Sequence, residues 1–330
     1  MYDRDINKKG SRQMRKNQME IRIKDLDKYY GRKHALKHLT LTIPSGMFGL
    51  LGRNGAGKTT LMKVLFGLET PQTGKVYMDG KEVKILNTLD AIEKGIGMVH
   101  QHFMLIPSLT VAENVVLGVE PMKNGLFDFK KAVEMTEEVA KKYNFNIDPM
   151  ARVSDLSVGQ MQKIEIMKVL IKGAKSIIMD EPTAVLTPQE TEELFEQLIL
   201  LRNSGHSIIF ISHKLEEINE LCEWVTILRD GRIIDSGKIE TFTKEEIISK
   251  RIGREIKNKF PKRDFEAGGK EVLRVENLSR RGVLSDVFFT LREGEILGVA
   301  GLGGAGRTEI GRAICGIDYI DSGDVYVEGK

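Results

Sequence analysis

The stretch Gly52–Thr59 reads GRNGAGKT and decides the fold. It fits the pattern G-x-x-x-x-G-K-[ST], whose glycines let backbone N–H groups fold around phosphate oxygens. The apolar run GMFGLLG leads into it, and KTTLMKVLFGL, closed by Gly67, follows it. We expect the first run to be a buried strand and the second a helix whose positive end points at the phosphates. This context favours a phosphate-binding loop over the alternative, a plain glycine turn.

The polar side chains of this loop suit a nucleotide and Mg²⁺. Lys58 would reach the β- and γ-phosphates, and the Thr59 hydroxyl would hold the metal ion. The residues that we expect to bind nucleotide here are Gly52, Arg53, Asn54, Gly55, Ala56, Gly57, Lys58, Thr59 and Thr60.

The segment SIIMDEP, residues 176–182, supplies a second half of such a site. Asp180 ends a buried apolar strand and can hold Mg²⁺ through water. Glu181, which strand alternation would point to the opposite side, can take a proton from an attacking water. Acidic residues often end strands, so this pair is informative because the glycine loop accompanies it.

Strands and helices alternate along the rest of this region. The apolar runs SIIMDEP and HSIIFISH are separated by the helical stretch PQETEELFEQLILLRNSG. Such alternation predicts an α/β fold with a parallel sheet covered on both faces. The opening MEIRIKDLDKYYG alternates apolar and polar residues, as a half-buried strand does.

The chain repeats part of itself. Residues 301–330 align without a gap on residues 52–81, with eleven identities, and Gly301–Thr308 reads GLGGAGRT. Arg307 stands where the first copy has Lys58. The second copy stops at Lys330, the counterpart of Lys81, so the sequence holds no second version of what the first copy carries after Lys81. We therefore expect the second domain to be truncated in this chain. The predicted organisation is a basic flexible tail (1–18), a complete first domain (19–255), a linker (256–270) and the start of a second domain (271–330).

Composition narrows the class of protein. A formal net charge of +3 over 330 residues gives no basic stripe, so we expect no nucleic-acid partner. No apolar run approaches the ~20 residues that span a bilayer. A role at a membrane would therefore need a partner protein. The sequence has only two cysteines, Cys222 and Cys315. We expect both side chains to be buried as small apolar groups, and the protein to lie in a reducing compartment.

The stretch LSVGQ, which opens a long helix at residues 156–160, is the most diagnostic. An ordinary N-cap serine would explain Ser157 but not Gly159 and Gln160. These residues suit an anion-binding helix start. With the glycine loop and SIIMDEP, they make residues 19–330 resemble the ATP-binding subunit of an ABC transporter, whose signature is LSGGQ; Val158 replaces its first glycine. The resemblance implies a P-loop NTPase fold of ABC type, with a parallel-sheet core, an antiparallel β part and a helical insertion at about 102–160.

The resemblance also assigns roles to single residues. Tyr30 resembles the aromatic residue that stacks on adenine, although a strand-end tyrosine is the alternative. Gln101 resembles the glutamine that senses Mg²⁺ and meets the permease, and His213 the histidine that contacts the γ-phosphate. The resemblance implies that Lys58, Gln101, Glu181 and His213 are catalytic and that Thr59, Gln101 and Asp180 bind the metal ion. It also adds six residues to the nucleotide-binding residues of the glycine loop: Tyr30, Gln101, Ser157, Gly159, Gln160 and Asp180. One departure is Thr187, where the family has an aspartate.

Two ATPase halves with a degenerate second loop resemble importers of simple sugars and nucleosides. The implied function is ATP hydrolysis that powers uptake, with ATP and Mg²⁺ as cofactors. The implied partners are transmembrane permease subunits, a second ATPase domain or subunit and, indirectly, an extracytoplasmic solute-binding protein. The implied location is peripheral, on the cytoplasmic face of the membrane. The alternatives are a soluble ABC-type ATPase acting on a ribosome or DNA, and a non-catalytic ATP-binding regulator.

In this family two ATPase domains sandwich ATP, with the phosphate loop of one facing the signature of the other. The loop at Gly301 would then face Ser157 and Gly159. Because the planar fork of Arg307 cannot mimic a compact ammonium, we expect that site to hydrolyse poorly. The loop at Gly52 would be the competent one.

Overall fold

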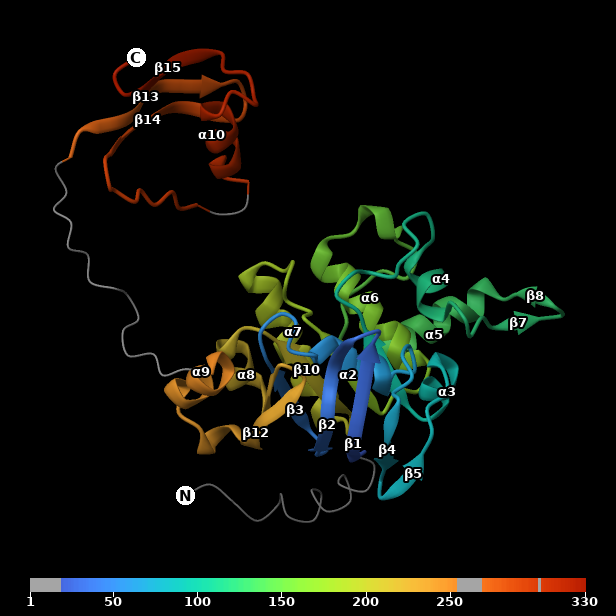
Figure 1. The fold of residues 1–330 in the computed structure, drawn as a ribbon. Coiled ribbons are helices and arrows are strands. Elements are labelled where there is room, and N and C mark those ends of the chain that lie inside the picture. The colour runs from blue at the N-terminus through green and yellow to red at the C-terminus, as the bar shows by residue number, and fades with distance from the viewer. Residues whose placement is uncertain (1–18, 254–268, 302–303) are drawn as a thin grey trace, which may run out of the picture. The chain divides into compact units, whose positions relative to one another are not determined.

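The computed structural model describes residues 19–253, 269–301 and 304–330. The predicted basic tail, most of the predicted linker and residues 302–303 of the second loop lie outside these ranges. The chain divides into two compact units, Met1–Glu255 and Ile256–Lys330, which Figure 1 shows in blue to orange and in orange to red.

The first unit is built on a six-stranded sheet. Its strands, in order across the sheet, are β12 (Arg232–Lys238), β11 (Trp224–Arg229), β3 (Met47–Leu51), β10 (Ser207–Ser212), β9 (Ser176–Asp180) and β6 (Ile96–Val99). All neighbouring strands are parallel except β12, which runs antiparallel to β11. Every residue of β3, β6, β9 and β10 is buried, as expected for strands covered on both faces.

The two faces of this sheet pack into different apolar clusters. Within β3, Met47 and Leu51 belong to one cluster, whereas Phe48 and Leu50 belong to the other. The second cluster also takes residues of an antiparallel sheet with the order β2 (Lys33–Ile43), β1 (Ile21–Tyr30), β4 (Thr73–Met78) and β5 (Lys81–Val83). The predicted α/β fold, with a parallel core and an antiparallel part, is confirmed.

Helices connect and cover these sheets. They are α2 (Lys58–Leu65), α3 (Thr88–Glu93), α4 (Val111–Val116), α5 (Phe129–Lys142), α6 (Val158–Ile171), α7 (Pro188–Asn203), α8 (Leu215–Leu221) and α9 (Lys244–Ile252), with short 3₁₀ turns η2 (Val153–Asp155) and η3 (Ile239–Thr241). Figure 1 shows α4, α5 and a small hairpin, β7 (Met122–Lys123) and β8 (Leu126–Phe127), gathered at one side of the unit. In the described part of the chain, no helix combines the length and apolar character needed to cross a bilayer.

Buried polar side chains tie the segment after β6 to these helices. On α6, the Glu165 carboxylate accepts the Met104 backbone N–H (2.5 Å), and the Lys168 ammonium donates to the Met104 carbonyl (2.6 Å). On α4, Asn114 exchanges hydrogen bonds with both backbone groups of Ile106. All three residues are less than one-tenth exposed, so these hydrogen bonds hold the segment against the helices.

The second unit repeats the start of the first. Its elements are β13 (Glu271–Arg280), β14 (Leu284–Arg292), α10 (Arg307–Ile314) and β15 (Ser322–Val327), and its sheet order β14-β13-β15 matches β2-β1-β4. The register agrees as well, because Val275 pairs with Val325 as Ile23 pairs with Val76.

The expectation that both cysteines are buried was wrong for Cys315. Cys222 is buried in the core of the first unit, but Cys315 is exposed. Its counterpart in the first copy, Phe66, packs edge-on against the ring of His100, with the ring centroids 6.0 Å apart. The described residues of the second unit include no counterpart of that histidine, so nothing there covers the position.

A candidate nucleotide-binding site

A pocket of about 570 Å³ opens at the carboxyl end of β3. Its lining residues come from five places far apart in the sequence: the β1–β2 hairpin, the glycine loop, and the segments after β6, β9 and β11. The lining residues are Tyr30, Lys33, His34, Ala35, Lys37, Arg53, Asn54, Gly55, Ala56, Gly57, Lys58, Thr59, Thr60, Gln101, Glu181, Asp230 and Gly231.

The glycine loop has the backbone geometry that its sequence demands. Gly57 has φ 105° and forms the N-cap of α2, a conformation that an L-residue with a side chain rarely adopts. A Cβ on Gly52 would come within 2.6 Å of the Leu228 carbonyl oxygen. No side chain caps the start of α2, so the free N–H groups and the positive end of this helix open into the pocket.

Lys58 lies at the centre of the site. Its side chain is only 5% exposed, and its ammonium donates to the Gly52 carbonyl at 2.7 Å. The ammonium is also 3.7 Å from Oε1 of Glu181. Burial lowers the pKa of Lys58, and the carboxylates of Glu181 and Asp180 oppose that shift. The cation is therefore poorly solvated and available for an anionic ligand.

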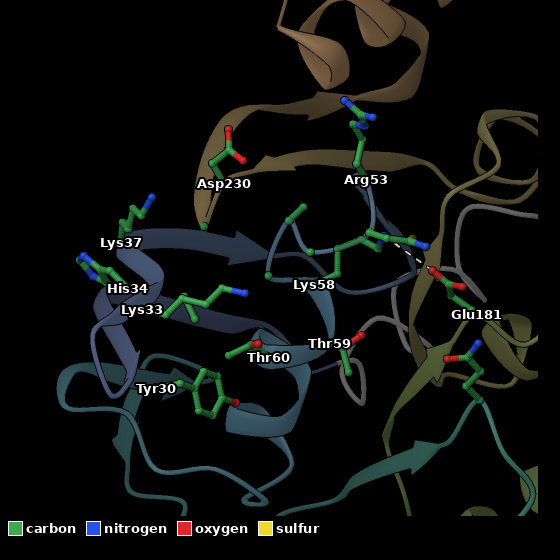
Figure 2. Close-up of a pocket in the computed structure, with 17 residues that line it drawn as sticks. Tyr30, Lys33, His34, Lys37, Arg53, Lys58, Thr59, Thr60, Glu181 and Asp230 are labelled. Atoms are coloured by element: carbon green, nitrogen blue, oxygen red, sulfur yellow. Dashed lines mark ion pairs between the residues drawn. The ribbon is translucent and has the colours of Figure 1, made fainter.

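Glu181 is placed by a backbone turn rather than by strand alternation. It lies one residue beyond β9 with φ 50°, in the left-handed region that non-glycine residues rarely occupy. Its Oε2 is 3.3 Å from Nδ1 of His213. Figure 2 shows the carboxylate pointing toward Lys58, with a dashed line between the two side chains. Strain of this kind is typical of functional sites.

Asp180 lies behind the pocket lining. It is 5% exposed, and burial together with the charge of Glu181 raises its pKa, an effect that a hydrogen bond with Thr59 partly offsets. With Gln101 nearby in the lining, the available donors are a carboxylate, a hydroxyl and an amide. Such hard oxygen donors suit Mg²⁺, and a dication would relieve the two neighbouring negative charges.

The side wall is made by the β1–β2 hairpin. Tyr30 is 41% exposed, and the Lys28 ammonium lies 5.1 Å from the centroid of its ring. Burial raises the pKa of Tyr30, while a hydrogen bond with Thr60 lowers it, and Figure 2 shows these two side chains close together.

The structure gathers most of the predicted residues and separates others. Besides Tyr30 and Gln101, the lining contains every loop residue from Arg53 to Thr60. Gly52 is not part of the lining, but its carbonyl accepts the hydrogen bond from the Lys58 ammonium. His213, 48% exposed, reaches the site through Glu181.

The signature residues lie elsewhere, at the start of α6. There Ser157 and Gln160 form a capping box, and the Gly159 N–H donates to Oε1 of Glu190 at 3.0 Å. None of the three residues lines this pocket. Within one copy of the first unit, the signature and the glycine loop therefore do not form a single site.

Several lining residues carried no sequence signal. Lys33, His34 and Lys37 come from the β1–β2 hairpin, and Asp230 and Gly231 from the β11–β12 turn. No motif marks them, because only the pairing of β11 with β3 brings the turn to the loop. The Gly231 N–H then donates to the Ala56 carbonyl at 2.9 Å.

Comparison with known proteins agrees with this geometry. Residues 36–184 match the family model described as ABC transporter. The ribose import ATP-binding protein RbsA of Bacillus licheniformis is 40% identical over 314 residues, which are 94% of this chain and 64% of the relative. The galactose/methyl galactoside import ATP-binding protein MglA of Clostridium tetani is 41% identical over 324 residues, 96% of this chain and 64% of the relative. The chain thus spans less than two thirds of the length of these curated relatives.

Solved structures show the same fold. CbiO1 from Clostridium perfringens, described as part of the ABC transporter complex cbiONQ, is 26% identical with a TM-score of 0.60, covering 70% of this chain and 93% of that one. An ATP-binding cassette solved in an ADP conformation is 24% identical with a TM-score of 0.63, covering 73% and 99%. The first unit of this chain therefore has the fold of an ABC ATP-binding cassette, and residues 36–184 match the ABC transporter family model.

Proposed function

We propose that this chain hydrolyses ATP, and that hydrolysis powers uptake of a simple sugar or nucleoside through a partner permease. The observation that carries the proposal is the position of Glu181, whose carboxylate joins Lys58 and His213 at the edge of the pocket. The names of the relatives, which are import proteins for ribose and galactose, favour a sugar.

The chain's residues divide the work of hydrolysis. The loop N–H groups and Lys58 hold the phosphates. Thr59, Gln101 and Asp180 would hold Mg²⁺, which when bound neutralises phosphate charge. Glu181 accepts a proton from water as the water oxygen bonds to the γ-phosphorus and the bond to the β–γ bridging oxygen breaks. ADP and inorganic phosphate are the products, and His213 orients the Glu181 carboxylate.

The segment that follows Gln101 is the proposed contact with the permease. Met104 is 60% and Ile106 39% exposed, whereas Leu105 packs against the main apolar cluster. Beside Met104 lies an apolar hollow of about 160 Å³ whose walls include Phe66 and His100. Packing on the helical part thus accounts for Leu105 but leaves its two neighbours open to a partner, which we take to be a cytoplasmic helix of the permease.

A second ATPase domain or subunit is the other proposed partner. The signature residues Ser157, Gly159 and Gln160 lie outside the pocket of their own unit, so a facing domain would use them for its own nucleotide. An extracytoplasmic solute-binding protein would be linked only through the permease. With these partners, the proposed location of the chain is the cytoplasmic face of the membrane.

Glu181→Gln tests the proposal. The change keeps the shape but removes the base, and a general base contributes roughly 10²–10⁴ in rate. We expect the variant to bind ATP as the native chain does and to lose at least a hundredfold in phosphate release. Glu82→Gln, which changes a 43% exposed carboxylate on β5, is the matched control. A Glu181→Gln rate within about threefold of native would remove Glu181 from this role.

A further inference from the structure

Lys28 is a buried cation that lies against one face of the Tyr30 ring. It is 7% exposed at the end of β1, and its ammonium has two oxygen partners: Oε2 of Glu69 at 2.7 Å and the Thr70 carbonyl at 2.8 Å. The same ammonium lies over the Tyr30 ring, 5.1 Å from its centroid. Because a buried ammonium is costly unless it is paired, these contacts fix where it sits.

The two faces of the Tyr30 ring are therefore different. One face covers the ammonium of Lys28, in a cation–π contact. The ring is nevertheless 41% exposed and lines the pocket, so its opposite face is open to a ligand. A flat aromatic face at the edge of a phosphate-binding pocket suits stacking of a nucleotide base.

The second unit shows what the ion pair does without the ring. By the shared register and the gapless alignment, Arg280 occupies the position of Lys28 and Asp318 that of Glu69. Arg280 and Asp318 pair at 2.8 Å, so the link between the first strand and the turn after the loop helix recurs. The positions of Tyr29 and Tyr30 hold Arg281 and Gly282, so no aromatic ring recurs.

This contrast separates two roles of the cation. Pinning the strand to the turn needs only the ion pair, because the second unit has that pair and no ring. The Tyr30 ring of the first unit is 41% exposed and lies against the Lys28 ammonium, and its hydroxyl has hydrogen-bond partners in Thr60 and Glu69. Holding Tyr30 is an additional role of Lys28 in the first unit.

We propose that Lys28 is a positioning residue for base recognition: it holds the Tyr30 ring so that its open face stacks on the base of the nucleotide. This inference rests on the proposed ATP function. A ring already fixed loses less conformational freedom when a base binds, so the contact favours the complete nucleotide over its phosphates alone.

The experiment compares two ligands by calorimetry, MgATP and magnesium tripolyphosphate. The dissociation constant of magnesium tripolyphosphate divided by that of MgATP measures the contribution of the base and ribose. We expect Tyr30→Ala to lower this ratio about tenfold. Lys28→Met should lower it about three- to tenfold and leave tripolyphosphate binding unchanged. Lys28→Arg, which keeps the charge and can stack, should restore the ratio.

A double substitution and two further variants sharpen the test. If Lys28 acts through the ring, Lys28→Met should add nothing in the Tyr30→Ala background. Arg280→Met, which breaks the matching pair in the second unit, should leave the ratio unchanged. Glu69→Gln, which keeps the shape of Glu69 but removes the charge that pairs with Lys28 and contacts Tyr30, should lower the ratio and replaces Lys28→Met if that variant does not fold.

The outcomes separate this inference from the proposed function. A native chain that does not bind MgATP would overturn the proposed function itself. A native chain that binds MgATP, together with a Lys28→Met variant that weakens both ligands equally or adds fully to Tyr30→Ala, would overturn only the role of Lys28.

Discussion

Lys58→Arg copies the residue of the second glycine loop into the first. Lys58 is 5% exposed, and its ammonium fits between the Gly52 carbonyl, 2.7 Å away, and the Glu181 carboxylate, 3.7 Å away. An arginine adds length and a planar fork that do not fit the position of a compact ammonium between these two partners. Its counterpart Arg307, at the start of α10, is exposed in the described part of the second unit.

The size of the effect follows from this packing. Overfilling a tight buried site costs roughly 1–3 kcal/mol. If that cost falls on the transition state, where the cation must follow charge as it develops, it corresponds to a rate loss of about 5- to 160-fold. Lys58→Ala, which removes the charge altogether, should lose about 10²–10³ in rate.

The assay is phosphate release at saturating MgATP, with ATP binding measured separately. Arg307→Ala is the matched control and should keep the rate within about twofold, because its loop carries no buried cation to lose. Equal losses from Lys58→Ala and Arg307→Ala would refute the division between a working loop and a degenerate one. So would a Lys58→Arg variant with the native rate.

Three further predictions follow from the site. Asp180→Asn should abolish hydrolysis yet raise the free energy of unfolding by the ~0.5–2 kcal/mol typical of single stabilising changes, and Tm should rise with it. The raised pKa of Asp180 means that the folded state favours the protonated carboxyl. The gain in Tm should therefore vanish in thermal melts at a pH below 3.8, the ordinary pKa of the group, and grow as the pH rises above it. A gain that persists below pH 3.8 would contradict this explanation. Met104→Glu with Ile106→Glu, which charges the two exposed side chains of the segment after Gln101, should uncouple transport in reconstituted vesicles while ATP binding persists, and a chain that merely unfolds would favour internal packing instead. We expect the first unit of a second chain to supply the facing signature, so ATPase activity per chain should rise with protein concentration. A fast rate strictly proportional to concentration would exclude that pairing.

Local pattern was enough to predict the strand, loop and helix around Gly52. The run Met47–Leu51 is fully buried and feeds the loop, and α2 begins at Lys58. Both depend on neighbours within a few residues, and such short-range rules are visible in sequence. The alternation of apolar strands and helices likewise predicted the parallel sheet, which the pairing of β3, β9 and β10 confirms.

Long-range geometry was not visible in the same way. The side wall of the pocket depends on the register of β1 and β2, which shifts between Ile23 and Leu26 and again before Tyr29. No composition rule specifies such bulges. The direction of Glu181 was inferred from strand alternation, but the strand ends one residue earlier and a left-handed turn sets it instead.

The glycine loop of the first unit depends on a distant segment of the chain for its shape. In the first unit the loop rests on the β11–β12 turn, where the Gly231 N–H donates to the Ala56 carbonyl and the Leu228 carbonyl lies against Gly52. Ala56 is 4% exposed there, whereas its counterpart Ala305 is exposed, with no such support among the described residues of the second unit. The octapeptide supplies the turn, but the buried cation and the shape of the phosphate cradle require a second segment that arrives through the sheet.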